Sequence, residues 1–592
     1  MSRPADLQAA IDKYFQWEKN PKALEEAKAF VETESEATLR KFFFGDPLAF
    51  GTAGVRCRMA PGFSALNHAT VILLSHGLAK YILQYGKNKP DYKIVIGFDG
   101  RYRSAEFAKD AASVFIRNGI KVYLFSKVVP TPTVSFAAPF LNCDAGLMIT
   151  ASHNPKPDNG YKAYWSNGAQ IVAPRDVDIC KLAFDGNAPN PDYFDWSVVD
   201  QAENADYVLE EYVKSEAKLA KFKEQNGDSK LKFTYSAFHG VGYEASMKMF
   251  KAFGFNEDVI FSVKEQQDPD PTFRTVPNPN PEEGLRVLKL CTEEADRNGS
   301  QVVLVNDPDA DRIQVAEKQA DGKWRAFTGN EMGVILTDWT WHHWKMANKT
   351  ATAEERANIY ILNSAVSSQI ARTMAKMEGF KQDVALTGFK WIGNLADKYR
   401  KEGKNVILGW EESIGYMPGI TLDKDGVSVA AIFAEIANHF WSRLERRLSD
   451  HLYELYKRYG YHLTRNSYWI VPDKSVTTKI FETTSFNPPK TINGTKVVDV
   501  RDLTVFNTTK GASLPPSASS PMITYTLETG SIITLRASGT EPKVKYYIEL
   551  ITEPGIDRSG EDQVLARLDE LEKAVVAEIL RPEEFKLIPR EK

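Results

Sequence analysis

Short apolar runs alternate with helix-like segments through most of the chain, and this alternation is the strongest constraint on its fold. The run KIVIGF at Lys93–Phe98 predicts a buried strand, a helix-like stretch follows it, and a second strand-like run begins at Lys121. Strands that alternate with helices of about 10–15 residues are typical of α/β domains with a parallel sheet. The pattern recurs twice more along the chain, although no fixed sequence period relates the copies.

The length of the chain and a change of pattern near Asp450 predict the domain organisation. A chain of 592 residues is too long for one hydrophobic core, and about 150 residues per domain suggests roughly four domains. Beyond Asp450, strand-like runs such as YHLTRNSYWIV precede a final helix, and the polar stretch Asp192–Tyr207 is interpreted as a linker. We expect an α/β protein with three similar mixed α/β-sheet domains and a smaller C-terminal α+β domain, divided into residues 1–205 (with a helical N-terminal extension), 206–325, 326–447 and 448–592.

Composition excludes several classes of protein. The formal net charge of −4 gives no global basic field, so no nucleic-acid partner is expected. The longest apolar stretches fall short of a membrane-spanning helix, and the N-terminal residues lack the apolar core of a secretory signal. The 4 cysteines lie far apart without a metal or redox motif, which fits free thiols in a reducing cytosol and predicts a cytoplasmic protein.

The run ITASHNP places Ser152 directly after a strand-like segment. Open α/β sheets bind their ligands at the carboxyl ends of strands, so the Ser152 hydroxyl would lie where chemistry is possible. The turn dipeptides Asn154-Pro155 and Asn159-Gly160 fit a plain turn equally well. Taken alone, the segment leaves open whether Ser152 is a turn residue or a nucleophile.

The run VVLVNDPDADR places three carboxylates, those of Asp307, Asp309 and Asp311, directly after another strand-like segment. Carboxylates at alternate positions repel one another unless a cation lies among them, and Mg²⁺ takes such oxygen ligands together with phosphate oxygens. Arg312 adjoins and could bind a phosphate group bidentately. The alternative is an acidic turn exposed to solvent.

Four other loops offer related chemistry with a plain alternative each. Arg536, Ser538, Gly539 and Thr540 predict a phosphate-binding nest or a simple hairpin turn. The run GWEESIGY offers a carboxylate and a hydroxyl for sugar hydroxyl groups, or the capped start of a helix. Lys390, after another strand-like run, could bind phosphate or transfer a proton, or it could be a surface side chain. Arg56 ends the Gly-rich run FGTAGVR, which could be a functional loop or a flexible connector.

Together these loops resemble the α-D-phosphohexomutase family. TASHNP around Ser152 is similar to the family's phosphoserine loop, and DPDADR at Asp307–Arg312 is similar to its Mg²⁺ loop. EES at Glu411–Ser413 resembles its sugar-recognition loop, and RASGTEP at Arg536–Pro542 resembles its phosphate-binding loop. The motifs FGTAGVR and TGFKWIG also fit, and DPDPTF and NPNPEEG resemble the larger phosphoglucomutase/phosphopentomutase (phosphoribomutase) branch.

The resemblance implies four domains around a central cleft and a phosphoserine mechanism. Ser152 would carry the phosphoryl group, and Mg²⁺ would lie between its phosphate and Asp307, Asp309 and Asp311. Lys162 matches the position of a general base. The other residues implied as catalytic are His153 beside the phosphoserine, Arg56, which would order its loop, and Lys390 on the sugar side.

The resemblance also implies how a sugar phosphate would be held. Carboxylate and hydroxyl groups of the EES motif would bind the sugar hydroxyls, and the RASGTEP loop would hold the phosphate that does not react. The substrate-binding residues implied in this way are Arg312, Thr387, Gly388, Glu411, Ser413, Arg536, Ser538, Gly539, Thr540 and Lys543.

We therefore expect a phosphosugar mutase that works through a bisphosphate intermediate. Its substrates would be glucose 1-phosphate and glucose 6-phosphate, ribose 1-phosphate and ribose 5-phosphate, or both pairs. Mg²⁺ is the expected cofactor, and glucose 1,6-bisphosphate or ribose 1,5-bisphosphate is the expected activator. Small-molecule sugar phosphates are the expected partners, with no nucleic acid and no membrane, and the chain is expected to be a monomer or weak oligomer.

Three alternatives accompany this hypothesis. A glucose 1,6-bisphosphate synthase of the same branch would combine poor mutase turnover with a retained phosphoserine. An aspartyl-nucleophile phosphatase would use Asp307 as the attacking group, but it leaves TASHNP and RASGTEP unexplained. A sugar-phosphate-binding relative without catalysis would have lost catalytic residues, whereas every expected residue type is present here.

Overall fold

The structure, a computed structural model, describes residues 3–85, 91–506, 514–516, 520–538 and 542–590. The chain forms two compact units, and each is described by itself. The first unit contains residues 1–332 and 388–447, and the second contains residues 333–387 and 448–592. Within the described part of the chain, no helix combines the length and the apolar character needed to cross a membrane.

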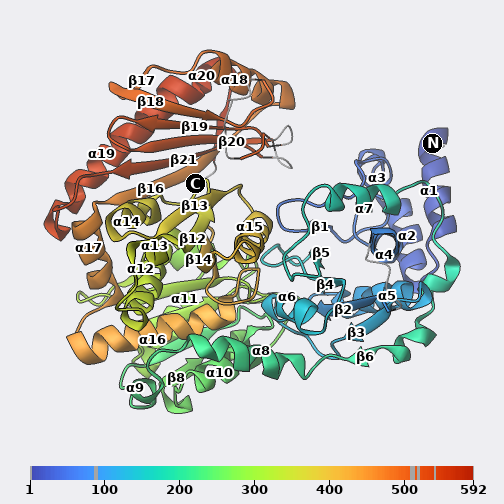
Figure 1. The fold of residues 1–592 in the computed structure, drawn as a ribbon. Coiled ribbons are helices and arrows are strands. Elements are labelled where there is room, and N and C mark those ends of the chain that lie inside the picture. The colour runs from blue at the N-terminus through green and yellow to red at the C-terminus, as the bar shows by residue number, and fades with distance from the viewer. Residues whose placement is uncertain (1–2, 86–90, 507–513, 517–519, 539–541, 591–592) are drawn as a thin grey trace. The chain divides into compact units, whose positions relative to one another are not determined.

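The first unit begins with a six-stranded sheet in the order β1-β5-β4-β2-β3-β6 (Figure 1). Strands β2, β3, β4 and β6 run parallel, whereas β5 is antiparallel to β4 and β1 is antiparallel to β5. All five residues of β4 are buried, as expected for a strand covered on both faces. The strands are Val55–Arg58 (β1), Lys93–Phe98 (β2), Lys121–Leu124 (β3), Ala145–Ile149 (β4), Asp158–Trp165 (β5) and Glu203–Asn204 (β6), and the helices are His68–Tyr85 (α4), Ser104–Arg117 (α5), Thr131–Phe140 (α6) and Arg175–Ala183 (α7).

Three helices precede this sheet and form a separate apolar cluster against it. They are Ala5–Trp17 (α1), Pro21–Thr33 (α2) and Glu36–Phe43 (α3). Their buried side chains, such as Leu7 and Ile11, pack together with Ala60, Ala65 and Ala69 of the sheet domain. The helical N-terminal extension expected from the sequence is therefore present and buried against its neighbour.

The stretch Asp192–Tyr207, interpreted as a linker, is folded against the first sheet. The stretch contains two short 3-10 helices and strand β6, which pairs with β3 at the edge of the sheet. Ser113 and Trp196 fix it to helix α5, because Ser113 Oγ donates to the Asp195 carbonyl at 2.8 Å and Trp196 Nε1 donates to Asp110 at 2.9 Å. Tyr193 and Ala205 are also buried, and Phe194, Val199 and Ala202 pack against the core of this sheet, so apolar as well as polar contacts hold the stretch.

A second sheet in the first unit repeats the arrangement of the first. Its order is β11-β10-β9-β7-β8. Strands β7, β8 and β9 run parallel, and β10 is antiparallel to both of its neighbours, β9 and β11. The strands are Phe233–Ser236 (β7), Ile260–Ser262 (β8), Val302–Asn306 (β9), Ile313–Lys318 (β10) and Trp324–Ala326 (β11). The helices around them are Val208–Glu216 (α8), Lys223–Gly227 (α9), Gly242–Ala252 (α10), Lys289–Asn298 (α11) and Gly426–Leu444 (α16).

The rest of the first unit contains helix α15 (Phe389–Lys401) and an antiparallel pair, β14 (Asn405–Glu411) and β15 (Gly415–Met417). Three strands of the first unit are each followed by a short turn and an antiparallel partner: β4 by β5, β9 by β10, and β14 by β15. The three turns hold the motifs TASHNP, DPDADR and EES. The repeat that has no fixed sequence period is therefore a repeat of structure.

The second unit contains a parallel strand pair and a large antiparallel sheet. Strands β12 (Ile359–Ser364) and β13 (Lys381–Ala385) pair in parallel. The seven-stranded sheet has the order β17-β18-β19-β20-β21-β16-β22. Its strands are His462–Ile470 (β16), Thr491–Ile492 (β17), Thr495–Asp502 (β18), Met522–Leu527 (β19), Ile532–Ala537 (β20), Lys543–Ile551 (β21) and Ile588–Pro589 (β22).

Helices complete the second unit. Helix α12 (Gly329–Ala347) starts at the end of the first unit and continues into the second. The others are Ala353–Ala357 (α13), Ile370–Glu378 (α14), Leu448–Tyr459 (α17), Lys474–Phe486 (α18), Glu561–Ala574 (α19) and Pro582–Phe585 (α20). The mixed α/β sheets and the C-terminal antiparallel sheet confirm the expected fold class, while the domain boundaries at residues 205, 325 and 447 stay predictions.

Candidate active site

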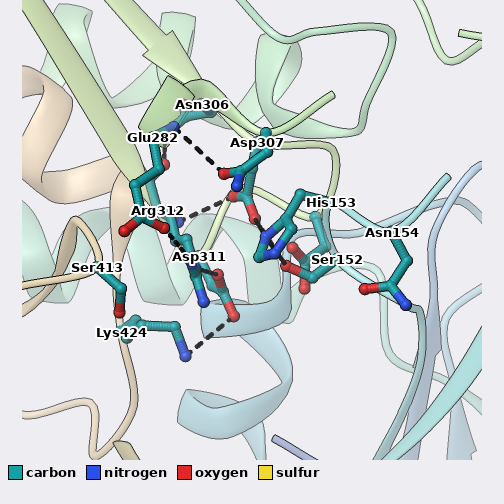
Figure 2. Close-up of polar contacts among 12 residues, drawn as sticks. Ser152, His153, Asn154, Glu282, Asn306, Asp307, Asp311, Arg312, Ser413 and Lys424 are labelled. Carbon is teal, nitrogen blue, oxygen red and sulfur yellow. Dashed lines mark hydrogen bonds and ion pairs between the residues drawn. The ribbon is translucent and has the colours of Figure 1, made fainter. Parts of the chain in front are cut away.

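Ser152 and the carboxylates that follow β9 meet within the first unit (Figure 2). Ser152 Oγ donates a hydrogen bond to Asp307 Oδ2 at 2.8 Å, across 155 positions of sequence. The Ser152 side chain is fully buried, and its backbone has φ of 53°, a left-handed conformation that non-glycine residues seldom adopt. Such strain persists only where the surroundings impose it, and it is frequent at functional sites.

Arg101 holds the backbone around Ser152. Its Nη2 donates to the carbonyls of Ser152 and Asn154, both at 2.5 Å, and its Nη1 donates to the carbonyls of Pro155 and Asp158 at 3.1 and 3.2 Å. The guanidinium fork, with its five donors, is suited to bridging several acceptors at once. The loop that carries the nucleophile candidate is therefore fixed from one side by a single buried side chain.

Asp307, Asp309 and Asp311 form a compact aspartate triad. All three are fully buried, and one ligand oxygen from each lies within 4.8 Å of the others. Among the described residues, Asp309 Oδ1 and Asp311 Oδ1 have no hydrogen-bond partner, although the other oxygen of each carboxylate has one. Buried carboxylate oxygens that converge without donors fit a hard divalent cation such as Mg²⁺.

Two lysines neutralise part of the triad. Lys162 Nζ donates to Asp309 Oδ2 at 2.5 Å and to Asp311 Oδ2 at 2.8 Å. Lys424 Nζ lies 3.3 Å from Asp311 Oδ2, a contact that Figure 2 shows. Burial acts to raise the pKa of Asp311, but the Lys162 and Lys424 cations together hold this pKa well below its usual value. Burial and the neighbouring Asp311 charge raise the pKa of Asp309.

Three cations lie close to the triad carboxylates: Lys162, Lys424 and Arg312, whose Nε lies 3.8 Å from Asp311 Oδ1. Lys424 and Arg312 also have other carboxylates nearby, those of Asp423 at 3.6 Å and Glu282 at 3.4 Å. A Mg²⁺ ion and a phosphoserine dianion would add two positive and about two negative charges, so the net charge of the cluster would change little with both present. The residues therefore fit a cation together with a phosphate better than either alone.

Arg56 and His153 border this cluster. Arg56 Nε and Nη2 are shielded from solvent and, among the described residues, have no hydrogen-bond acceptor, so the guanidinium can accommodate an anion. His153 Nδ1 lies 3.2 Å from Ser152 Oγ and 3.8 Å from Asp307 Oδ2. Burial, together with the Arg312 and Arg56 cations, holds the pKa of His153 well below its usual value.

The EES motif forms the tight turn between β14 and β15, so the alternative of a helix start is wrong. Ser413 Oγ donates to Glu411 Oε1 at 3.0 Å, and burial raises the pKa of Glu411 against the opposing charge of Lys424. Lys390 lies in the first turn of α15, where its Nζ contacts the Gly51 carbonyl at 3.1 Å and Asp176 Oδ2 at 3.2 Å. Lys390 thus contacts the FGTAGVR loop and α7.

The remaining predicted residues divide between the two units. Gly388, in the first unit, has φ of 106°, a conformation that favours glycine just before α15. In the second unit, the Thr387 hydroxyl is buried, Arg536 Nε donates to Ser520 Oγ at 3.1 Å, and the Ser538 amide donates to the Lys543 carbonyl at 2.9 Å. Gly539 and Thr540 lie outside the described residues.

Sequence reasoning missed several residues of the site. Arg101 belongs to an Asp-Gly-Arg turn after β2, and Lys424 to the segment LDKDG before α16. Glu282 belongs to NPNPEEG, and its carboxylate lies 3.4 Å from Arg312 Nη1. Thr131, at the start of α6, donates from Oγ1 to Asp309 Oδ2 at 2.6 Å. Each turn has a recognisable composition, but none contains a signal for its distant partner.

Comparisons with known proteins assign the chain to a family. The sequence matches the phosphoglucomutase/phosphomannomutase family in its alpha/beta/alpha domains I, II and III, at residues 47–189, 210–322 and 329–459. The Homo sapiens phosphopentomutase is 41% identical and aligns with 100% of this chain and 98% of its own length. The Homo sapiens glucose 1,6-bisphosphate synthase is 38% identical, with 99% and 96% covered.

A solved structure shares the fold at lower identity. The crystal structure of Paramecium pp63/parafusin, a phosphoglucomutase in an open form, gives a TM-score of 0.66 at 19% identity and covers 90% of this chain and 95% of its own. The matched ranges of the three family domains include both the Ser152 loop and the Asp307–Asp311 loop. The chain belongs to the phosphoglucomutase/phosphomannomutase family of α-D-phosphohexomutases, with three α/β/α domains and a C-terminal antiparallel-sheet domain, and it is an intramolecular phosphotransferase.

Proposed function

We propose that this enzyme moves a phosphoryl group between C1 and the terminal hydroxyl of an aldose phosphate, with Ser152 as the carrier. One observation supports the proposal most strongly: the Ser152 hydroxyl donates to Asp307, inside a buried cluster of three carboxylates that could hold a metal ion. A free serine hydroxyl is a weak nucleophile, so the resting enzyme would store the phosphoryl group on Ser152.

Transfer from Ser152 needs one bond exchange. The sugar hydroxyl oxygen attacks phosphorus, the bond from phosphorus to Ser152 Oγ breaks, and the hydroxyl proton passes to a base. Asp307, Asp309 and Asp311, with the Ser152 phosphate, would hold Mg²⁺, which would neutralise charge on the transferring group. Positioning and electrostatic stabilisation supply most of the catalysis in such transfers.

We assign the role of the base to Lys162, provided that its side chain is released from the two aspartates it contacts. Its Nζ donates to Asp309 and Asp311 in the structure, which makes it a neutralising charge in this state. Once a cation occupied the triad, Lys162 Nζ would be free of those carboxylate oxygens and, as the neutral amine, would accept the proton of the sugar hydroxyl. Arg312, Arg56 and His153 would hold the phosphoryl oxygens and the loop around them.

The other end of the substrate would be held by groups that are equivalent for either orientation. Glu411 and Ser413 would bind vicinal sugar hydroxyls, and Lys390 with Thr387 and Gly388 would border the sugar. The non-reacting phosphate would be held by Arg536, Ser538 and Lys543, together with Gly539 and Thr540. Reorientation of the bisphosphate would then bring its second phosphate to Ser152.

We favour pentose phosphates as the main substrates, because the Homo sapiens relative at 41% identity over the whole chain is a phosphopentomutase. A bisphosphate synthase is the second candidate, favoured by the 38% identical relative of that name. Mutase turnover of ribose 1-phosphate, measured beside glucose 1-phosphate and beside bisphosphate formation from a phosphoryl donor, separates the two. Higher kcat/KM for ribose 1-phosphate supports the proposal, and bisphosphate formation faster than either mutase reaction contradicts it.

The carrier role has its own test. Ser152→Ala is expected to abolish transfer of ³²P from labelled enzyme to sugar phosphate, whereas Ser166→Ala, at an exposed turn, should behave like the wild type. Mutase turnover at the wild-type rate in Ser152→Ala would exclude the mechanism and leave an aspartyl nucleophile as the better account.

A further inference from the structure

A cavity of about 580 Å³ lies on the outer side of the Ser152 loop, between that loop and the N-terminal helices. Its walls come from α1 and α2, from the end of β1, from residues 102–106, and from Lys156 and Pro157 of the loop itself. Helices α1 and α2 precede residue 47, where the match to the family's first domain begins. No residue of the cavity belongs to the catalytic cluster described above.

The charges of the cavity favour an anion. Four of its lining residues are basic and two are acidic, which leaves a formal charge of +2: Lys22, Arg58, Arg103 and Lys156 against Glu26 and Glu106. Arg103 pairs with Glu26. In the described part of the chain, Lys22, Arg58 and Lys156 have no carboxylate within ion-pair distance. A phosphate monoester, with a charge near −2 at neutral pH, matches this balance.

The rest of the lining is apolar and partly aromatic. Phe30, Met59, Pro61 and Pro157 contribute apolar surface, and Tyr102 keeps 48% of its area exposed. The volume lies within the range of about 300–1,000 Å³ that is typical of small-molecule sites. A phosphate attached to a planar ring system therefore fits better than a phosphate alone.

The cavity is connected directly to the nucleophile loop. Arg101, which donates to the carbonyls of Ser152 and Asn154, is followed in the chain by Tyr102 and Arg103, two lining residues. From the other wall, the Met59 amide donates to the Pro157 carbonyl at 2.8 Å. A ligand that bridges these walls would contact both attachments of the loop.

We propose that this cavity binds a nucleoside monophosphate as an effector and that binding steadies the Ser152 loop. The phosphate would lie among Lys22, Arg58 and Lys156, and the base would lie against Tyr102 and the prolines. Because the cavity residues take no part in phosphoryl transfer, nucleotide binding can be measured separately from mutase turnover.

Isothermal titration of the full chain with AMP, with adenosine as the probe that lacks phosphate, tests the proposal. We expect AMP to bind and adenosine to bind at least about tenfold more weakly, because charged hydrogen bonds are lost. The double variant Lys22→Ala/Arg58→Ala should weaken AMP binding by about tenfold or more. Lys28→Ala, an exposed lysine of α2 outside the cavity, is the matched control and should bind AMP like the wild type.

Hydrogen exchange supplies the second readout. AMP should slow amide exchange in residues 150–158 of the wild type and of Lys28→Ala, but not in the double variant. Equal AMP affinity in wild type and double variant would place the nucleotide elsewhere, such as the catalytic cluster, and would overturn the proposal. Absent AMP binding, equal affinity for adenosine, or unchanged exchange in residues 150–158 would overturn it as well.

Discussion

Two buried carboxylate sites show how differently this protein treats a negative charge. In the first unit, Asp311 is fully buried beside the Lys162 and Lys424 cations, which hold its pKa well below the usual value despite its burial. In the second unit, Glu549 is buried against Ser368 Oγ and the Gln369 amide, at 2.5 and 3.0 Å, and burial raises its pKa to about 7.

The difference lies in the partners. Neutral donors only partly offset the cost of burying a carboxylate, whereas full cations favour the ionised form. Glu549 can therefore fix α14 to β21 as a neutral acid at mildly acidic pH, whereas Asp311 stays charged. Neighbouring charges rather than burial distinguish these two carboxyl groups.

Removal of one triad carboxylate should have the largest effect. Asp309→Asn takes a charged ligand from the Asp307–Asp311 loop, and kcat is expected to fall by about 10²–10³-fold. Initial rates over a magnesium titration check this, and added Mg²⁺ should not restore the rate. Asp321→Asn, in an exposed turn, is the control; a wild-type rate for Asp309→Asn would show that the triad is a structural acid cluster like Glu549.

Removal of the Lys162 cation should make the triad resemble the Glu549 site, where neutral donors rather than a lysine hold the buried carboxyl group. Lys162→Met leaves Asp309 and Asp311 without their shared donor, and the free energy of unfolding is expected to fall by about 3 kcal/mol. Urea unfolding measures this loss, and Mg²⁺ should recover part of it because the ion binds only the folded triad. Unchanged stability, as expected for the exposed control Lys181→Met, would contradict the electrostatic account.

Removal of the second cation should have a smaller effect of the same kind. Lys424→Met leaves Asp311 paired with Lys162, and kcat is expected to fall by about tenfold. Steady-state kinetics with both sugar phosphates measure the change. A loss as large as that of Asp309→Asn would instead mean that Lys424 contacts the substrate directly.

The smallest effect is expected at Glu549. Its folded pKa of about 7 lies above the unfolded value, so the folded chain binds more protons between these values and loses stability as pH rises through them. The loss should be about 1 kcal/mol per pH unit between pH 5 and 7. Urea unfolding of Glu549→Gln should lack this slope while the exposed control Glu553→Gln keeps it, and an equal slope in both variants would assign the pH dependence to another group.

Local pattern made much of this fold predictable. The strand at Lys93–Phe98 was predicted with its observed bounds because its apolar run ends in a turn signal, and the two loops of Ser152 and Asp307 were placed at strand ends for the same reason. Strand β6 was not predicted, since two polar residues at a sheet edge carry no apolar signature. The sequence pattern therefore predicts elements whose position depends on burial of apolar side chains.

Polar contacts between residues far apart in the chain could not be predicted from the sequence. Lys162 could be expected near Ser152 because β5 returns beside β4, but its bonds to Asp309 and Asp311 span 147 and 149 positions. The grip of Arg101 on the Ser152 loop spans 51 positions. Such contacts depend on how separately predicted elements pack, and a turn motif does not encode its partner.

The central claim is that Ser152 carries the phosphoryl group, and peptide mass mapping of the working enzyme tests it most directly. Enzyme taken during turnover and digested should yield the peptide containing Ser152 with one added phosphate, and excess sugar monophosphate should remove this phosphate only with formation of sugar bisphosphate. A phosphate found on Asp307, or an enzyme at full turnover whose Ser152 peptide is never phosphorylated, would contradict the account.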